Sequence, residues 1–164
     1  MGFDGAAKQD GKNPILTYLK ESGADILCLQ EYSTVQSSKH LSQKDVEREL
    51  KAYPYHRINT VGSGKGHTNK IACYSKFPIL SSRILDYPSE YNGSVLYEIK
   101  IGEDTVTLIN NHLESNKLTK ADKVVYEDML KSPEKEKVKS GARLLIRKLA
   151  EASAIRAPQA DTIA

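Results

Sequence analysis

Hydrophobic and polar positions in the first part of the chain predict a helix followed at once by a buried strand. Apolar residues recur at helical spacing after Asn13-Pro14, at Ile15, Leu16 and Leu19. Asparagine is a good N-cap, proline suits the first helical position, and Gly23 provides a stop. The segment 25–31 (DILCLQE) follows with four apolar residues in succession, which predicts a strand buried on both faces.

Beyond residue 42 the pattern predicts short strands and then helices. We expect a short helix over 43–52 and strands over 55–61, 70–74, 79–85, 94–101 and 105–111. The close spacing of these runs favours hairpins, hence an antiparallel or mixed sheet. From Leu118 onward the pattern is helical, and Pro133 divides it into two helices. The sequence therefore predicts an α/β (α+β) fold with a mixed, largely antiparallel sheet and flanking helices.

Composition and charge exclude few classes of protein. The chain has 164 residues, enough for one domain, and a net charge of +3 that does not by itself imply a nucleic-acid partner. Cys28 and Cys73 lie in apolar runs, and we predict that both are buried free thiols. No apolar run approaches the roughly 20 residues of a membrane span, and no signal peptide is visible.

Two segments carry side chains suited to catalysis, each at the end of a predicted strand. Glu31 closes the buried strand, at the sheet rim where α/β proteins bind ligands, and its carboxylate is a hard oxygen ligand suited to Mg²⁺. Asn111 and His112 close a later strand, where the histidine could act as a general acid or bind phosphate and the asparagine could bond a phosphoryl oxygen. The plainer interpretation is a surface glutamate and residues that satisfy a turn.

The order of these segments resembles the endonuclease/exonuclease/phosphatase (DNase I-like) superfamily. The resemblance covers about residues 13–164 and rests on the ordered set LQE, YSKFPI, NGSVLYEI, NNHLES and IRAPQA. It implies part of a DNase I-like four-layer sandwich. No single motif is decisive, whereas the set in this order and spacing is fairly specific.

Carried over residue by residue, the resemblance gives each candidate a role. Glu31 matches the family's Mg²⁺ ligand, and His112 matches the histidine that binds the scissile phosphate and assists as an acid. Asn111 takes the place of a Thr or Asn beside that histidine, and Asn92 that of a polar residue on the substrate side. Arg156 and Gln159, on the long helix, match a pair that we interpret as structural.

The sequence departs from the family pattern at both ends. The family begins with a strand that ends in an Asn near the metal, and it continues after the long helix with a Gly-Asp-x-Asn strand and an Asp-His pair that activates water. Neither of the latter motifs occurs in the 164 residues. We therefore expect residues 1–164 to be a single partial domain, without the family's N-terminal strand and C-terminal half.

The resemblance implies a fragment of a Mg²⁺-dependent phosphoesterase, with Mn²⁺ as the alternative ion. The substrate would be a phosphoester of a nucleic acid, a phospholipid or an inositol phosphate, and the fragment alone would have negligible activity. We expect no stable protein partner, although uncovered sheet edges favour self-association. The alternative is an inactive interaction module or a nucleic-acid-binding module that uses Arg143, Arg147 and Lys148. The sequence leaves the substrate and the cellular location open.

Overall fold

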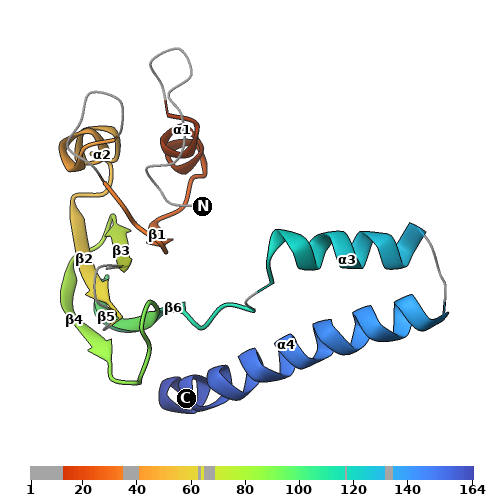
Figure 1. Ribbon diagram of the computed structural model, residues 1–164. Helices are drawn as coiled ribbons and strands as arrows, with labels where there is room; N and C mark the ends of the chain where they lie inside the picture. The colour runs from red at the N-terminus through yellow and green to blue at the C-terminus, as the bar shows by residue number, and fades with distance from the viewer. Residues whose placement is uncertain (1–12, 35–40, 63, 65–68, 117, 132–134) are drawn as a thin grey trace. The chain divides into compact units, whose positions relative to one another are not determined.

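The chain forms two compact units that meet in sequence between His112 and Leu113. The computed structural model describes residues 13–34, 41–62, 64, 69–116, 118–131 and 135–164. Ten helices and strands follow one another in these residues, with strands in the first unit and only helices in the second (Figure 1). Across the described residues, no helix has the length and apolar character needed to cross a membrane.

The first helix begins and ends where the sequence predicts. In α1 (Pro14–Glu21), the side chain of Asn13 accepts hydrogen bonds from the N–H groups of Ile15 at 3.0 Å and Leu16 at 3.1 Å. Gly23, just after the helix, has φ +70°, a left-handed conformation that glycine adopts without a steric penalty. This turn leads the chain directly into β1 (Ile26–Leu29).

A three-stranded antiparallel sheet has the order β1-β3-β2, with β2 spanning Tyr55–Val61 and β3 spanning Asn69–Ser75. The helices α1 and α2 (Gln43–Glu49) cover one face of this sheet. The buried cluster between them comprises Leu16, Leu27, Leu29, Tyr32, Leu41, Val46, Leu50, Tyr53, Ala72 and Tyr74. Burial of this apolar surface is the main force that holds α1 and α2 on the sheet.

The second sheet has the order β4-β5-β6 and is also antiparallel. Its strands are β4 (Ile79–Leu85), β5 (Gly93–Ile101) and β6 (Asp104–His112). It packs on the other face of the first sheet through a second cluster, which comprises Val61, Ile71, Cys73, Ile79, Val95, Tyr97 and Ile99. The first unit thus has three layers: helices, sheet and sheet.

The second unit is a pair of helices, α3 (Lys120–Lys131) and α4 (Lys135–Ile163), which lie side by side (Figure 1). A buried ion pair joins them, since Lys148 Nζ lies 2.6 Å and 2.8 Å from the two carboxylate oxygens of Asp122. Gly141 lets the two helices approach closely, because a Cβ there would come within 2.6 Å of Met129 Sδ. Pro133, predicted to divide the helices, lies outside the described residues.

The predicted fold class is confirmed, with two corrections of detail. The strands form two sheets, and every pairing among the described residues is antiparallel rather than mixed. The prediction that β1 is buried on both faces is wrong. Leu27 and Leu29 are buried beneath the helices, whereas Cys28 is exposed, because β1 lies at an edge of its sheet and its other face is only partly covered. Cys73, on the central strand β3, is buried as predicted.

Candidate active site

Glu31 and His112 come together although 80 residues separate them in the sequence. Glu31 follows the end of β1 in the first sheet, and His112 is the last residue of β6 in the second. His112 Nε2 lies 3.7 Å from Glu31 Oε1. The imidazole is 18% exposed and the carboxylate 42% exposed, so solvent reaches both side chains. The sequence-based expectation that these two side chains share one rim agrees with this geometry.

The strand register explains why His112 faces Glu31. On β6, His112 pairs with Gly93 and Asn110 pairs with Val95, a residue of the cluster between the two sheets. Because side chains alternate along a strand, His112 and Asn110 point toward the first sheet. Asn111, between them, points to the opposite face of β6. The structure therefore brings Glu31 and His112 together and does not bring the Asn111 side chain to them.

A hydrogen-bonded clamp holds the two strand ends together, and the sequence analysis did not predict it. The side-chain amide of Gln30 donates to the backbone carbonyl of Asn111 and, at 3.4 Å, to Asn110 Oδ1. Asn110 is 3% exposed, and its own amide donates to the carbonyl of Ala72 on β3 at 3.4 Å. These bonds connect β6 with both β1 and β3 beside the Glu31–His112 pair. Gln30 and Asn110 are thus positioning residues for the candidate site.

The backbone at Glu31 is strained, and the next residue anchors it. Glu31 has φ +51°, the one positive φ at a non-glycine position among the described residues. Such conformations cost roughly 1–2 kcal/mol and cluster at functional sites. The N–H of Tyr32 donates to the carbonyl of Lys70 at 2.8 Å, and its buried hydroxyl donates to Gln43 Oε1 at 2.6 Å. Burial raises the pKa of Tyr32, so its hydroxyl remains a neutral donor.

Two buried polar atoms at the end of β6 have no hydrogen-bond partner within the described part of the chain. They are Nδ1 of His112 and Oδ1 of Asn111. Native proteins satisfy most buried polar atoms, so each such atom calls for a water molecule, an ion or a ligand.

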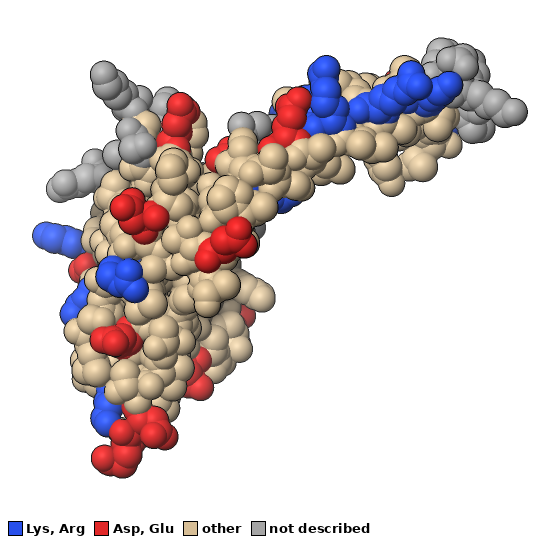
Figure 2. All heavy atoms as spheres, turned by 90° about the horizontal axis from the view of Figure 1, so that it is seen from below, with Lys and Arg blue, Asp and Glu red and all other residues tan. Residues whose placement is uncertain are grey.

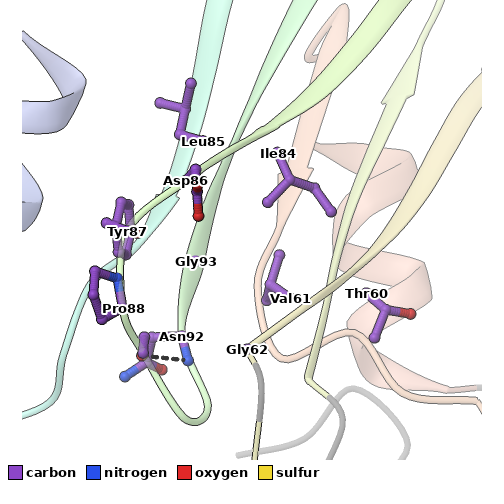
Figure 3. A pocket seen from close by; sticks show the side chains of 11 residues that line it. Thr60, Val61, Gly62, Ile84, Leu85, Asp86, Tyr87, Pro88, Asn92 and Gly93 are labelled. Atoms are coloured by element: carbon purple, nitrogen blue, oxygen red, sulfur yellow. Dashed lines mark hydrogen bonds between the residues drawn. The ribbon is translucent and has the colours of Figure 1, made fainter.

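Asn92 lies at the same end of the second sheet, just before Gly93, the residue paired with His112. It is buried, and its N–H donates to Ser89 Oγ at 3.0 Å. Asn92 lines a cavity of about 490 Å³ between the ends of β2 and β4 and the loop before β5 (Figure 3). The other lining residues are Thr60, Val61, Gly62, Ile84, Leu85, Asp86, Tyr87, Pro88, Ser89 and Gly93. The role of Asn92 in substrate binding stays a prediction.

Arg156 and Gln159 both act within the second unit. Gln159 is 2% exposed, and its side-chain oxygen accepts a hydrogen bond from the N–H of Glu114 at 3.0 Å. Arg156 donates to the side chain of Asn116 and, at 3.3 Å, to Ser153 Oγ. These bonds attach the segment after β6 to α4, which agrees with the structural role predicted for the pair.

A divalent cation fits at Glu31 only as part of a larger ligand set. The described residues contain no group of three or more His, Cys, Asp and Glu side chains placed to hold a metal ion. Protein sites for Mg²⁺ commonly use one or two carboxylates and complete the shell with water and substrate phosphate. The half-exposed carboxylate of Glu31 suits one such position. The expectation of Mg²⁺ or Mn²⁺ remains a prediction.

Comparison with known proteins identifies the family. A sequence model of the Endonuclease/Exonuclease/phosphatase family matches residues 2–156. Two crystal structures of TDP2 from Caenorhabditis elegans resemble the chain. The selenomethionine form is 24% identical, with a TM-score of 0.41, over 73% of this chain and 37% of that one. A truncated form is 21% identical, with a TM-score of 0.40, over 73% of this chain and 49% of that one.

The chain thus spans less than half the length of these solved chains. No curated protein matches it. The family match, in contrast, extends over nearly all of the sequence and includes both Glu31 and His112. The chain belongs to the Endonuclease/Exonuclease/phosphatase family.

Proposed function

We propose that the chain supplies Glu31 and His112 to the active site of a metal-dependent enzyme that hydrolyses phosphoesters. The observation that carries the proposal is the 3.7 Å approach of His112 Nε2 to Glu31 Oε1 at the adjoining ends of two strands. A carboxylate and an imidazole at one open rim match the two needs of this chemistry, a ligand for a hard cation and a proton donor for phosphate.

Glu31 would hold Mg²⁺, or Mn²⁺ in its place, through its carboxylate. A bound divalent ion supplies Lewis-acid polarisation of a phosphoryl oxygen. His112 would donate a hydrogen bond to the phosphate from Nε2, the ring nitrogen that lies 3.7 Å from Glu31 Oε1. The clamp of Gln30 and Asn110 would keep these two side chains at a fixed separation. Asn92 would contact another part of the substrate. Asn111 would do so only for a substrate that also reaches the opposite face of β6.

The remaining catalytic groups would come from residues beyond these 164. The sequence contains neither the Gly-Asp-x-Asn strand nor the Asp-His pair that the family uses to complete its site. Catalytic groups act as a unit, and removal of one member eliminates most of the effect of the others. We therefore expect the chain alone to have negligible turnover and to bind Mg²⁺ weakly.

The alternative of a nucleic-acid-binding module on the helices has less support. Figure 2 shows Lys and Arg side chains along the helical part of the chain, as such a module would require. However, Lys148 makes two short bonds to the buried carboxylate of Asp122. Arg147 lies 3.7 Å from the carboxylate of Glu151. Of the three cations predicted to form a stripe, two therefore have a carboxylate partner, which weakens the case for a phosphate-binding stripe.

The test is hydrolysis of a chromogenic phosphodiester by the full-length protein that contains this chain, assayed with Mg²⁺ and with a chelator. We expect Mg²⁺-dependent turnover that falls by about 100-fold or more in Glu31→Gln and in His112→Ala. Glu103→Gln is the matched control, since Glu103 lies in the β5–β6 turn at the other end of the strands that lead to His112. Turnover that survives Glu31→Gln would refute the assignment.

The same assay on the 164-residue chain tests whether the active site needs catalytic groups from outside this chain. Turnover within about tenfold of that of the full-length protein would show that the chain carries a complete site. It would contradict the expectation that Glu31 and His112 need the other catalytic groups to act. A panel of single-stranded DNA, a phospholipid and an inositol polyphosphate, offered to the full-length protein, would then identify the substrate class.

A further inference from the structure

Cys28 and Cys73 are directly opposite one another on neighbouring strands. They are Cα partners in the antiparallel pairing of β1 with β3. Opposite residues of an antiparallel pair place their side chains on the same face, with Cα atoms roughly 4.5–5.5 Å apart. That separation falls inside the range of about 4.4–6.8 Å found across disulfides. The pairing thus presents two thiols at disulfide spacing, and both are free.

The two thiols differ in access. Cys28 is exposed on the edge strand, whereas Cys73 is fully buried among the residues between the two sheets. A hydrogen bond from the Cys73 thiol lowers the pKa of Cys28, although partial burial opposes this effect. The same bond, together with burial, raises the pKa of Cys73. The accessible thiol is therefore the better nucleophile, and the buried one is held beside it as a protonated donor.

We propose that Cys28 and Cys73 form a thiol modification site, which small disulfides such as oxidised glutathione convert into an intramolecular cross-strand disulfide. Cys28 is the attacking residue, and Cys73 is the resolving residue. The inference does not depend on the proposed phosphoesterase function, because neither cysteine contacts a substrate or a metal in that proposal.

The reaction proceeds by two exchanges. The Cys28 thiolate attacks one sulfur of the small disulfide, so a mixed disulfide forms on Cys28 and a small thiolate leaves. Once Cys28 is part of the mixed disulfide, it is no longer a thiolate that accepts a hydrogen bond from the Cys73 thiol. Cys73 loses that proton to the departed thiolate and attacks Cys28 Sγ, which releases a second small thiolate that takes a proton from water. The protein dithiol is oxidised to a disulfide, and the small disulfide is reduced to two thiols.

The bond would add a covalent link to an edge strand that has one neighbouring strand, β3. In the described structure β1 pairs only with β3, and three residues after Cys28 the chain reaches Glu31. A disulfide between β1 and β3 would restrict fraying of this strand and close a long loop of chain between positions 28 and 73. A disulfide that closes a long loop lowers the conformational entropy of the unfolded chain, so oxidation should raise the Tm.

The experiment incubates the reduced 164-residue chain with oxidised glutathione and measures intact mass without reductant. Because the chain has only two cysteines, each product has a distinct mass. We expect a monomer that has lost two hydrogen atoms, carries no glutathione and has a higher Tm than the reduced chain. Dithiothreitol should restore the original mass and Tm.

Single variants separate the two roles. Cys73→Ser should retain a stable glutathione adduct on Cys28, because the resolving thiol is absent, whereas Cys28→Ser should remain unmodified while folded. The wild-type result alone decides the proposal, even if Cys73→Ser fails to fold. A stable glutathione adduct on the wild-type chain, a disulfide-linked dimer, or no reaction would each overturn it.

Discussion

Replacing Gly93 with alanine is expected to destabilise the strand unit, because β5 approaches β2 too closely at this point for a side chain. A Cβ on Gly93 would lie 2.6 Å from Val61 Cβ and 2.9 Å from Val61 Cγ1. Val61 is 1% exposed and belongs to the cluster between the sheets, so it has little space into which to move. Gly93 is also the residue paired with His112, which places the strain at the candidate site.

The size of the effect follows from two opposing contributions. Overpacking of a dense core costs about 1–3 kcal/mol. Alanine in place of glycine also lowers the conformational entropy of the unfolded chain, which stabilises the folded state by about 0.4–1 kcal/mol. The free energy of unfolding should therefore fall by about 1–2 kcal/mol. For a unit of 112 residues, this corresponds to a decrease in Tm of roughly 4–9 °C.

Urea and thermal unfolding followed by far-UV circular dichroism would measure the loss, and a double-mutant cycle would assign it. Val61→Ala removes the atom at 2.9 Å and keeps the one at 2.6 Å, so Gly93→Ala should cost less in its presence, by at least about 0.5 kcal/mol. Gly23→Ala is the control, since it meets no atom within 4 Å and loses stability only through its φ of +70°. Additive losses in the cycle, or an unchanged Tm for Gly93→Ala, would refute the reasoning.

Three further predictions test the surroundings of the site and the helical unit. Tyr32→Phe should lower the free energy of unfolding by about 1–3 kcal/mol, measured by urea denaturation, because it leaves Gln43 Oε1 without its buried donor. Glu31→Gly should be more stable than Glu31→Ala by about 1 kcal/mol in the same assay, the reverse of the usual order, because φ at this position is +51°. Lys148→Met should lower the Tm at neutral pH. The hydrogen bond from Lys148 is the largest of the effects that lower the pKa of Asp122 from 3.8 to about 2, so this contribution is present above pH 3.8. The difference in Tm from the wild type should therefore shrink as the pH falls from about 4 toward 2. Equal Tm values for Lys148→Met and the wild type at pH 7 would contradict this last prediction.

Much of the fold could be predicted because local signals and tertiary structure agree. The cap at Asn13, the stop at Gly23 and the strands 55–61 and 79–85 lie where the pattern places them. The helix predicted over 43–52 ends earlier, at Glu49. The division into two sheets could not be predicted, since strand partners depend on long-range packing that a local pattern does not encode.

The candidate site was only partly accessible to sequence reasoning. Glu31 and His112 could be chosen because each is a chemically capable residue that closes a strand. The clamp of Gln30 and Asn110 could not, because amide side chains at strand ends are common and only the tertiary contact distinguishes these two. Cys28 was misjudged because an apolar run does not reveal whether its strand lies at the centre or the edge of a sheet.

Paramagnetic broadening by Mn²⁺ in NMR spectra of the 164-residue chain tests the central claim most directly, because it detects even weak binding and requires no turnover. If Glu31 holds the ion, the amide signals of Glu31, Tyr32 and His112 should broaden first, while those of the turn at Gly102 remain sharp. Excess Mg²⁺ should reverse the effect, Glu31→Gln should abolish it, and Glu103→Gln should leave it unchanged. Broadening that survives Glu31→Gln, or that spares His112, would contradict the account.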